Sequence, residues 1–278
     1  MEKIIFIATI TLLLSCKSEF NDTRLGSLDQ INNRVATADK HAKTESGEWS
    51  GKKDQVIGNN FLSTKKFYAA ESSLILDYKY PHLDERYNPL FSNFNSFIQE
   101  NYLKTDKSIQ QVLQNDELSC DPLYQNAERR RRNIDYKIYT KNDRFLSILL
   151  YKTNYYEDEH HNSFMFKGLN YDLKKGAFLT YNNLFKNNSE DFLLFKLNQE
   201  LQARIRGQDS FYDCWELTQD KFEEFKSNFV IESTNIKFYF NDCTVCPTYS
   251  GNYFLEIPLE ELSQILKSKN LEISSYKS

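Results

Sequence analysis

The sequence lacks the short motifs on which several large classes of enzyme depend. It contains no glycine-rich phosphate loop, no GxSxG nucleophile elbow and no HExxH helix. We therefore expect a protein that is not an enzyme, with no catalytic residue, no bound metal and no cofactor.

An excess of positive charge is also missing. The chain has 35 Lys and Arg against 39 Asp and Glu, which gives a net charge of -4. This balance offers no support for nucleic-acid binding. With 40% hydrophobic, 15% aromatic and 27% charged residues, the composition is that of a folded, water-soluble body.

No apolar run is long enough to cross a bilayer, although the chain begins with a short one. The run at residues 4–14 falls well short of the about 20 residues that a spanning helix needs. It leads into LLSC at residues 13–16, which is a lipobox, so we interpret residues 1–16 as a lipoprotein signal peptide. Cys16 is the predicted lipidation site, and the mature protein is expected to be anchored to a membrane without spanning it.

The residues after the lipobox suggest where the protein is held. Lys17 stands where an aspartate would retain a lipoprotein at the inner membrane, by resemblance to bacterial sorting rules. We expect an outer-membrane anchor, with the folded part periplasmic or surface-facing. Residues 17–58 are too polar to bury much surface, so they are predicted to be a flexible tether.

The rest of the chain shows alternation typical of strands and apolar spacings of three and four typical of helices. We predict an α+β fold, with an antiparallel sheet built from hairpins, helices packed on one face and two intimately packed subdomains. The expected strands lie at 66–80, 134–139, 144–156, 164–173, 229–231, 236–240 and 253–257, and the expected helices at 88–103, 107–115, 189–206, 218–225 and 259–266.

Two stretches carry a family resemblance. Residues 164–185 read FMFKGLNYDLKKGAFLTYNNLF, and residues 228–242 read NFVIESTNIKFYFND, with Tyr249, Gly251, Ile257, Pro258 and Leu262 following in order. This pattern resembles the family of unknown function numbered 3298. A strand at 66–80 followed by a helix with Asn93 or Asn95 near its start resembles the family numbered 4163, which usually precedes it. The resemblance implies subdomains at 59–162 and 163–270.

Families of this kind occur in a lysozyme-sensing anti-sigma factor and beside a peptidoglycan deacetylase. The resemblance therefore implies a lipid-anchored binding or sensing module of the cell envelope, whose ligand is a muramidase-like protein or a cell-wall glycan. One alternative is a hydrolase or deacetylase-like enzyme acting on peptidoglycan, with Asp158, Glu159 or His161 as acid or base. A second alternative is a purely structural envelope lipoprotein.

Two loops depart most from the family pattern. The link 157–162 replaces the usual glycines, and residues 241–252 carry Asp242 and Cys243 where the family has Pro-Tyr. Both lead into strands that we place in one sheet, so a rigid scaffold would present them. Adjacent histidines in an extended segment point in opposite directions, which disfavours a metal site in the link. The candidate binding residues are His161, Tyr249, Gly251 and Tyr253.

The arginine run and the cysteines each allow more than one interpretation. The run Arg129–Arg132 is either an anion site or a solvated strand edge that discourages edge pairing. An even number of cysteines besides Cys16 favours disulfides in an exported chain. Three pairings are possible, of which Cys243 with Cys246 and Cys120 with Cys214 is favoured because the CxxC pair is already close in sequence.

Overall fold

The computed structural model describes residues 61–71, 74–104, 130–156, 162–207, 213–247, 250–251 and 253–267. Cys16, the tether at 17–58 and the helix predicted at 107–115 lie outside these residues, so they stay predictions. In the part of the chain described, no helix combines the length and the apolar character needed to cross a membrane.

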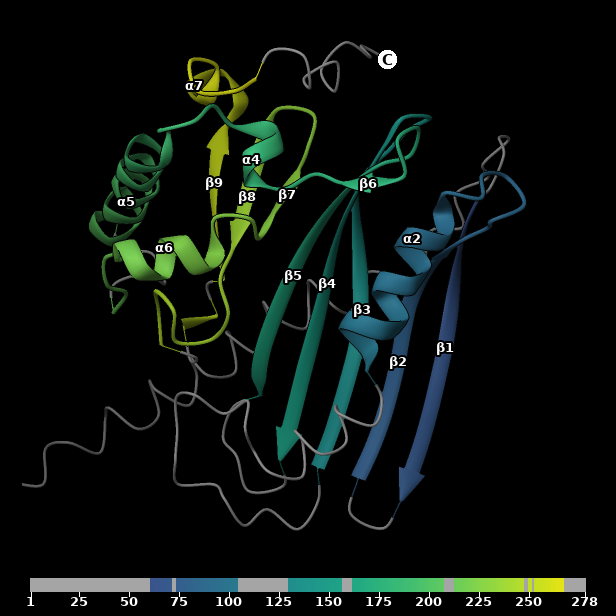
Figure 1. Cartoon of the computed structure of the whole chain (residues 1–278). Helices are drawn as coiled ribbons and strands as arrows, with labels where there is room; N and C mark the ends of the chain where they lie inside the picture. The colour runs from purple at the N-terminus through teal and green to yellow at the C-terminus, as the bar shows by residue number, and fades with distance from the viewer. Residues whose placement is uncertain are drawn as a thin grey trace, which may run out of the picture.

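Six strands form the larger sheet, side by side in the order of the sequence (Figure 1). Neighbouring strands are antiparallel except β2 and β3, which run parallel. The segment predicted as one strand at 66–80 instead belongs to two antiparallel strands that pair with each other. It contains no glycine or proline, so no turn signal separates the two strands in the sequence. The strands are β1 (Leu62–Glu71), β2 (Leu74–Leu83), β3 (Arg130–Lys141), β4 (Phe145–Tyr156), β5 (Ser163–Asp172) and β6 (Ala177–Phe178).

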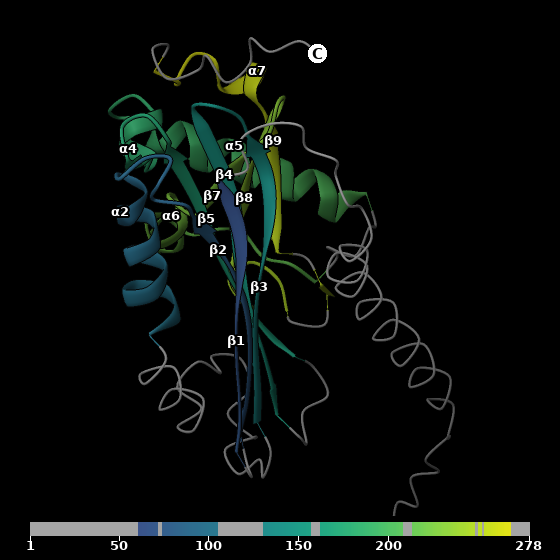
Figure 2. The ribbon, with the colours of Figure 1, turned by 90° about the vertical axis from the view of Figure 1, so that its right-hand side faces the viewer.

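One face of this sheet is covered by α2 (Phe91–Ser96) and the π-helical segment η2 (Phe97–Leu103). Figure 2 views the larger sheet along its edge and shows α2 on one side of it. The apolar spacing that predicts a helix at 88–103 places Phe94 and Ile98 in the core against the strands. Asn95 fixes the helix to β2, since its Oδ1 accepts from the Leu83 N–H at 2.9 Å and its Nδ2 donates to the Leu83 carbonyl at 2.8 Å.

A smaller antiparallel sheet follows, with the order β7 (Phe229–Ile231), β8 (Asn235–Tyr239) and β9 (Phe254–Pro258). Helices on its outer face complete a second core. They are α4 (Tyr181–Leu184), α5 (Glu190–Arg206), α6 (Gln219–Phe225) and α7 (Leu259–Leu262).

Helix α5 confirms the predicted helix at 189–206. Leu193, Leu197 and Leu201 are buried, whereas Phe195 is 63% exposed. Residues four apart share one face of a helix, so this set follows the 3.6-residue period.

The smaller sheet packs on the face of the larger sheet opposite α2, through Leu149, Val230 and Tyr239. The α+β class and the packing of helices on hairpin-built sheets are therefore confirmed, while the strands after β6 form a second sheet. The boundary predicted between residues 162 and 163 falls between β4 and β5, which are neighbours in one sheet. The two-subdomain division stays a prediction.

Candidate functional site

A groove of about 290 Å³ lies beside strand β5, between η2 and the end of α6. Binding sites for small molecules are concave and combine apolar walls with a few polar groups, and this groove has both. We call it the β5 groove. Its lining residues are Phe97, Asn101, Tyr102, Lys152, Met165, Phe166, Lys167, Glu224, Phe225, Asn228 and Asn241.

Strands β4 and β5 supply the positive charge of the β5 groove. Their register pairs Lys152 with Met165 and Leu150 with Lys167, so the two lysines are diagonal neighbours on one face of the sheet. Among the described residues, none forms a hydrogen bond or an ion pair with the Lys167 ammonium. Desolvation by burial lowers the pKa of Lys167 below its ordinary value.

The η2 segment supplies an aromatic wall. The Lys152 ammonium lies 4.9 Å from the centre of the Tyr102 ring, which is cation–π geometry. The Phe97 ring packs on the Phe178 ring of β6, with 4.8 Å between the ring centres. Lys104, in the left-handed region with φ 32°, ends the segment. π-Helical turns are rare and are found frequently at functional sites.

The opposite wall is built on the outer edge of β5. Strand β6 pairs with β5 only at its last two residues, so the backbone groups of the earlier residues need other partners. Asn228 supplies two of them, because its Oδ1 accepts from the Gly168 N–H at 2.7 Å and its Nδ2 donates to the Phe166 carbonyl at 3.1 Å. A side-chain amide thus takes the place of a neighbouring strand.

Asn241 and Asp242 take the place of a neighbouring strand in the same way, nearer the start of β5. Asn241 Oδ1 accepts from the Phe166 N–H at 2.8 Å, and Asp242 Oδ2 accepts from the Phe164 N–H at 2.5 Å. The Asp242 N–H in turn donates to the Phe164 carbonyl at 3.1 Å. We call Asn228, Asn241 and Asp242 the edge clasp. It fixes the smaller sheet to β5 and shapes one side of the β5 groove.

None of the four predicted binding residues is among the lining residues given above. His161 and Tyr249 lie outside the described residues. Gly251 adopts a left-handed conformation with φ 67°, and the Tyr253 ring packs 5.2 Å from that of Phe164 and 5.0 Å from that of Phe166.

Our placement of the two divergent loops before strands of one sheet was wrong, since they lead into β5 and β9, which belong to different sheets. The edge clasp nevertheless brings the start of the second loop onto the residues that follow the first. The Tyr253 ring packs on Phe164 and Phe166 of β5, next to the edge clasp.

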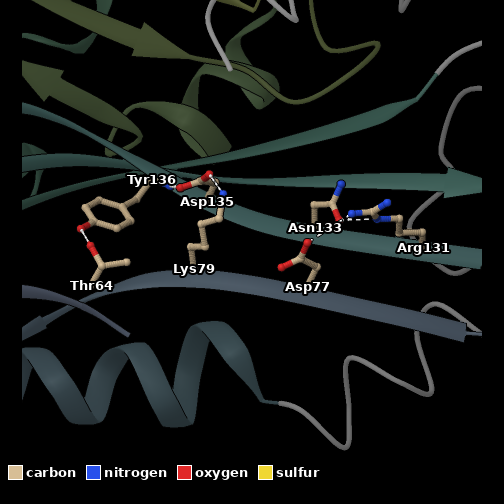
Figure 3. A network of polar contacts seen from close by, with 7 residues as sticks. All are labelled: Thr64, Asp77, Lys79, Arg131, Asn133, Asp135 and Tyr136. Carbon is tan, nitrogen blue, oxygen red and sulfur yellow. Dashed lines mark hydrogen bonds and ion pairs between the residues drawn. The ribbon is translucent and has the colours of Figure 1, made fainter. Parts of the chain in front are cut away.

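The described part of the arginine run, Arg130–Arg132, does not lie on a sheet edge, because β3 lies between β2 and β4. Arg132 is fully buried, and its Nε donates to Asn154 Oδ1 at 2.8 Å. Arg131 is exposed but engaged by Asp77 at 3.2 Å and Asn133 at 2.8 Å. Figure 3 shows this network between β2 and β3, together with the pairs Lys79 with Asp135 and Thr64 with Tyr136. Within this network Asp77 pairs with Arg131 and Asp135 with Lys79, so the network does not favour an anion site.

Metal binding has no support in the described part of the chain, where no group of three His, Cys, Asp or Glu side chains could hold an ion. The adjacent histidines of the link 157–162 lie outside that part.

The favoured cysteine pairing is wrong. Cys214 forms a disulfide with Cys246, and Cys243 is also disulfide-bonded, while Cys120 lies outside the described residues. Cys246 is buried in the second core, with Cys214 packed against that core. Cys243 sits in a left-handed turn with φ 55°. Closeness in sequence therefore did not decide the pairing, since the fold directs these two neighbouring cysteines to different partners.

Replacing Cys214 and Cys246 together with alanine is expected to lower the free energy of unfolding by about 3 to 4 kcal/mol, as chain entropy predicts for the sequence separation of 32. Denaturant unfolding of the oxidised proteins measures this difference. A Leu201→Ala variant separates lost packing from lost cross-linking, because it removes a buried side chain and keeps the disulfide. Dithiothreitol should therefore still lower the stability of Leu201→Ala through this bond, whereas the double alanine variant has no such bond to lose. A loss below about 1 kcal/mol would contradict the prediction.

Comparison with known proteins supports the resemblance to the family numbered 3298 over part of the chain. The family described as "Protein of unknown function (DUF3298)" matches residues 182–260. A crystal structure of a DUF3298 family member from Bacteroides fragilis is similar over 77% of this chain and 98% of that chain, with 18% identity and a TM-score of 0.53. A crystal structure of a DUF3298 family protein from Pseudomonas aeruginosa is similar over 74% of this chain and 94% of that chain, with 13% identity and a TM-score of 0.49.

No curated protein matches the chain. The likeness to the Bacteroides fragilis protein shows a shared fold. The predicted pairing with the family numbered 4163 stays a prediction.

Proposed function

We propose that this protein is a lipid-anchored binding module of the bacterial cell envelope that recognises cell-wall glycan in the β5 groove, without catalysis of its own. The observation that supports this most is the composition of the groove, where ammonium groups lie beside aromatic rings. Aromatic side chains offer apolar faces with large contact area, and a few polar groups beside them fix the orientation of a ligand.

The position of the β5 groove suits a sensing role. Its walls come from η2 before the predicted subdomain boundary and from α6 and the edge clasp after it. A ligand that contacts both walls binds the folded arrangement and not the unfolded chain, so it stabilises that arrangement by mass action. Thermal stability should therefore report binding.

Sedimentation with purified peptidoglycan sacculi tests the proposal, using the chain from residue 16 with Cys16→Ala. We expect the protein to sediment with sacculi and an Asn101→Trp variant, whose indole would fill the groove from an exposed position on η2, to lose at least about 10-fold in affinity. Gln99→Trp is the matched control, since Gln99 is exposed on the same segment and does not line the groove.

Three other results would reject the proposal in different ways. Capture of a purified muramidase with no binding to sacculi would make the ligand a protein. Release of soluble fragments from labelled sacculi would make the chain an enzyme. Equal sedimentation of both tryptophan variants would place glycan binding outside the β5 groove.

Membrane attachment is tested separately. Cys16→Ala is expected to abolish lipidation and release essentially all the protein from membranes, because the apolar run at 4–14 is too short to span a bilayer. Fractionation after carbonate extraction measures this, with Ser15→Ala as a control that leaves the acceptor cysteine in place. Retention of the Cys16→Ala protein in the membrane pellet would show that the run itself is an anchor.

A further inference from the structure

We propose that Lys167 and Lys152 form a carboxylate subsite in the β5 groove, so that the ligand is a sugar bearing a carboxylate and not a neutral one. This rests on the proposed function and names the chemical class of its ligand. The geometry that carries it is the placement of two lysines on one face of β4 and β5, beneath an aromatic wall.

Lys167 occupies a position where packing alone would favour an apolar residue. It pairs across the strands with Leu150, which is fully buried, and it lies two residues from buried Leu169 on the same face. Its side chain is partly buried, and no acceptor in the described part of the chain pairs with it. An ammonium that loses water without gaining a partner destabilises the fold. An anionic ligand would supply the missing partner.

The charges around Lys167 favour a negatively charged ligand over a neutral one. Lys152 is its diagonal neighbour, so both ammonium groups can approach one carboxylate. Glu224, the acidic residue in the lining, is held 2.9 Å from Lys221 by an ion pair outside the groove lining. Because Lys152 also lies over the Tyr102 ring, a ligand bound here would place its charge next to an aromatic face.

The β5 groove is small. A volume of about 290 Å³ is at the lower end of the range of about 300 to 1,000 Å³ for ligand sites. One sugar ring with its acidic substituent suits that space better than a folded protein surface does.

Calorimetry with the Cys16→Ala chain tests the inference using N-acetylmuramic acid, N-acetylglucosamine and inorganic phosphate as probes. We expect N-acetylmuramic acid to bind at least about 10-fold more tightly than N-acetylglucosamine. Lys167→Met, which keeps the length of the side chain, should abolish this preference, and Lys167→Arg should retain part of it. Lys79→Met is the matched control, because Lys79 is an exposed strand lysine paired with Asp135.

A second measurement does not depend on the variants folding. Titration of the lysine side chains by NMR should show the pKa of Lys167 rising when N-acetylmuramic acid is added and staying unchanged with N-acetylglucosamine, because only the former brings an opposite charge.

The possible failures are distinguishable. Equal binding of the two sugars, with no change in Lys167→Met, would overturn the carboxylate subsite and leave glycan binding intact. Phosphate that binds more tightly than N-acetylmuramic acid and displaces it would also overturn it. If neither sugar binds and sacculi do not sediment the protein, the proposed function itself fails.

Discussion

Replacing Gly168 with alanine is expected to lower the free energy of unfolding by about 4 kcal/mol or more, or to prevent folding. A Cβ atom on Gly168 would lie 2.3 Å from the carbonyl oxygen of Phe229 and 2.8 Å from its backbone nitrogen. Neither atom can rotate away as the end of a side chain could. The approach is close because Asn228, the residue before Phe229, accepts the Gly168 N–H. Denaturant unfolding measures the loss.

Gly176→Ala is the matched control. Gly176 has φ 63°, and a Cβ there would meet the side chain of Leu90, which is 42% exposed and can shift outward. The left-handed backbone conformation alone costs about 1 to 2 kcal/mol for a residue with a Cβ. Comparable losses in the two variants would show that the contact between β5 and β7 tolerates separation, and that the two sheets are not held at a fixed distance there.

Features that depend on local periodicity could be predicted from the sequence. The hairpin of β3 and β4 and the long helix α5 were found because their apolar residues repeat at the period of each structure. The burial of Arg132 could not be found in this way. Its partner Asn154 is 22 residues away, and four consecutive arginines have the composition of an exposed segment. A pairing between strands, not a local pattern, decides where that side chain lies.

The candidate site was missed for the same reason. Lys152 and Lys167 become neighbours only through the register of β4 and β5. One signal was present, because Lys167 interrupts an otherwise apolar face of its strand. The edge clasp gave no signal, since Asn228, Asn241 and Asp242 follow helices or strands where such residues usually form turns.

Asp242 is the titratable member of the edge clasp. It is 8% exposed, and burial raises the pKa of its carboxyl group to about 7, although hydrogen bonds from the Phe164 N–H and from Tyr253 and Ser163 act in the opposite direction. Desolvation disfavours the carboxylate more than these donors favour it. At neutral pH, the bond between the smaller sheet and the start of β5 therefore depends on a group that is partly protonated.

The protein is consequently expected to lose stability as the pH rises from about 4 to about 7. The folded chain keeps the Asp242 proton up to about pH 7, whereas the unfolded chain releases it near its ordinary pKa of 3.8. The folded state binds more protons in this window, so the free energy of unfolding falls with pH, by at most about 4 kcal/mol for a shift of about three pKa units. Denaturant midpoints measured across the window follow this change.

Asp242→Asn should remove this part of the pH dependence, because an amide Oδ1 can still accept from the Phe164 N–H and does not ionise. The variant should therefore be more stable than the natural chain above pH 7. Asp84→Asn is the control, since Arg86 lowers the pKa of Asp84 to about 2, and its contribution is lost only as the pH falls from about 4 toward 2. That variant should keep the slope between pH 4 and 7. If Asp242→Asn also keeps it, the Asp242 carboxyl group is solvated in the folded protein, and the edge clasp does not hold it away from water.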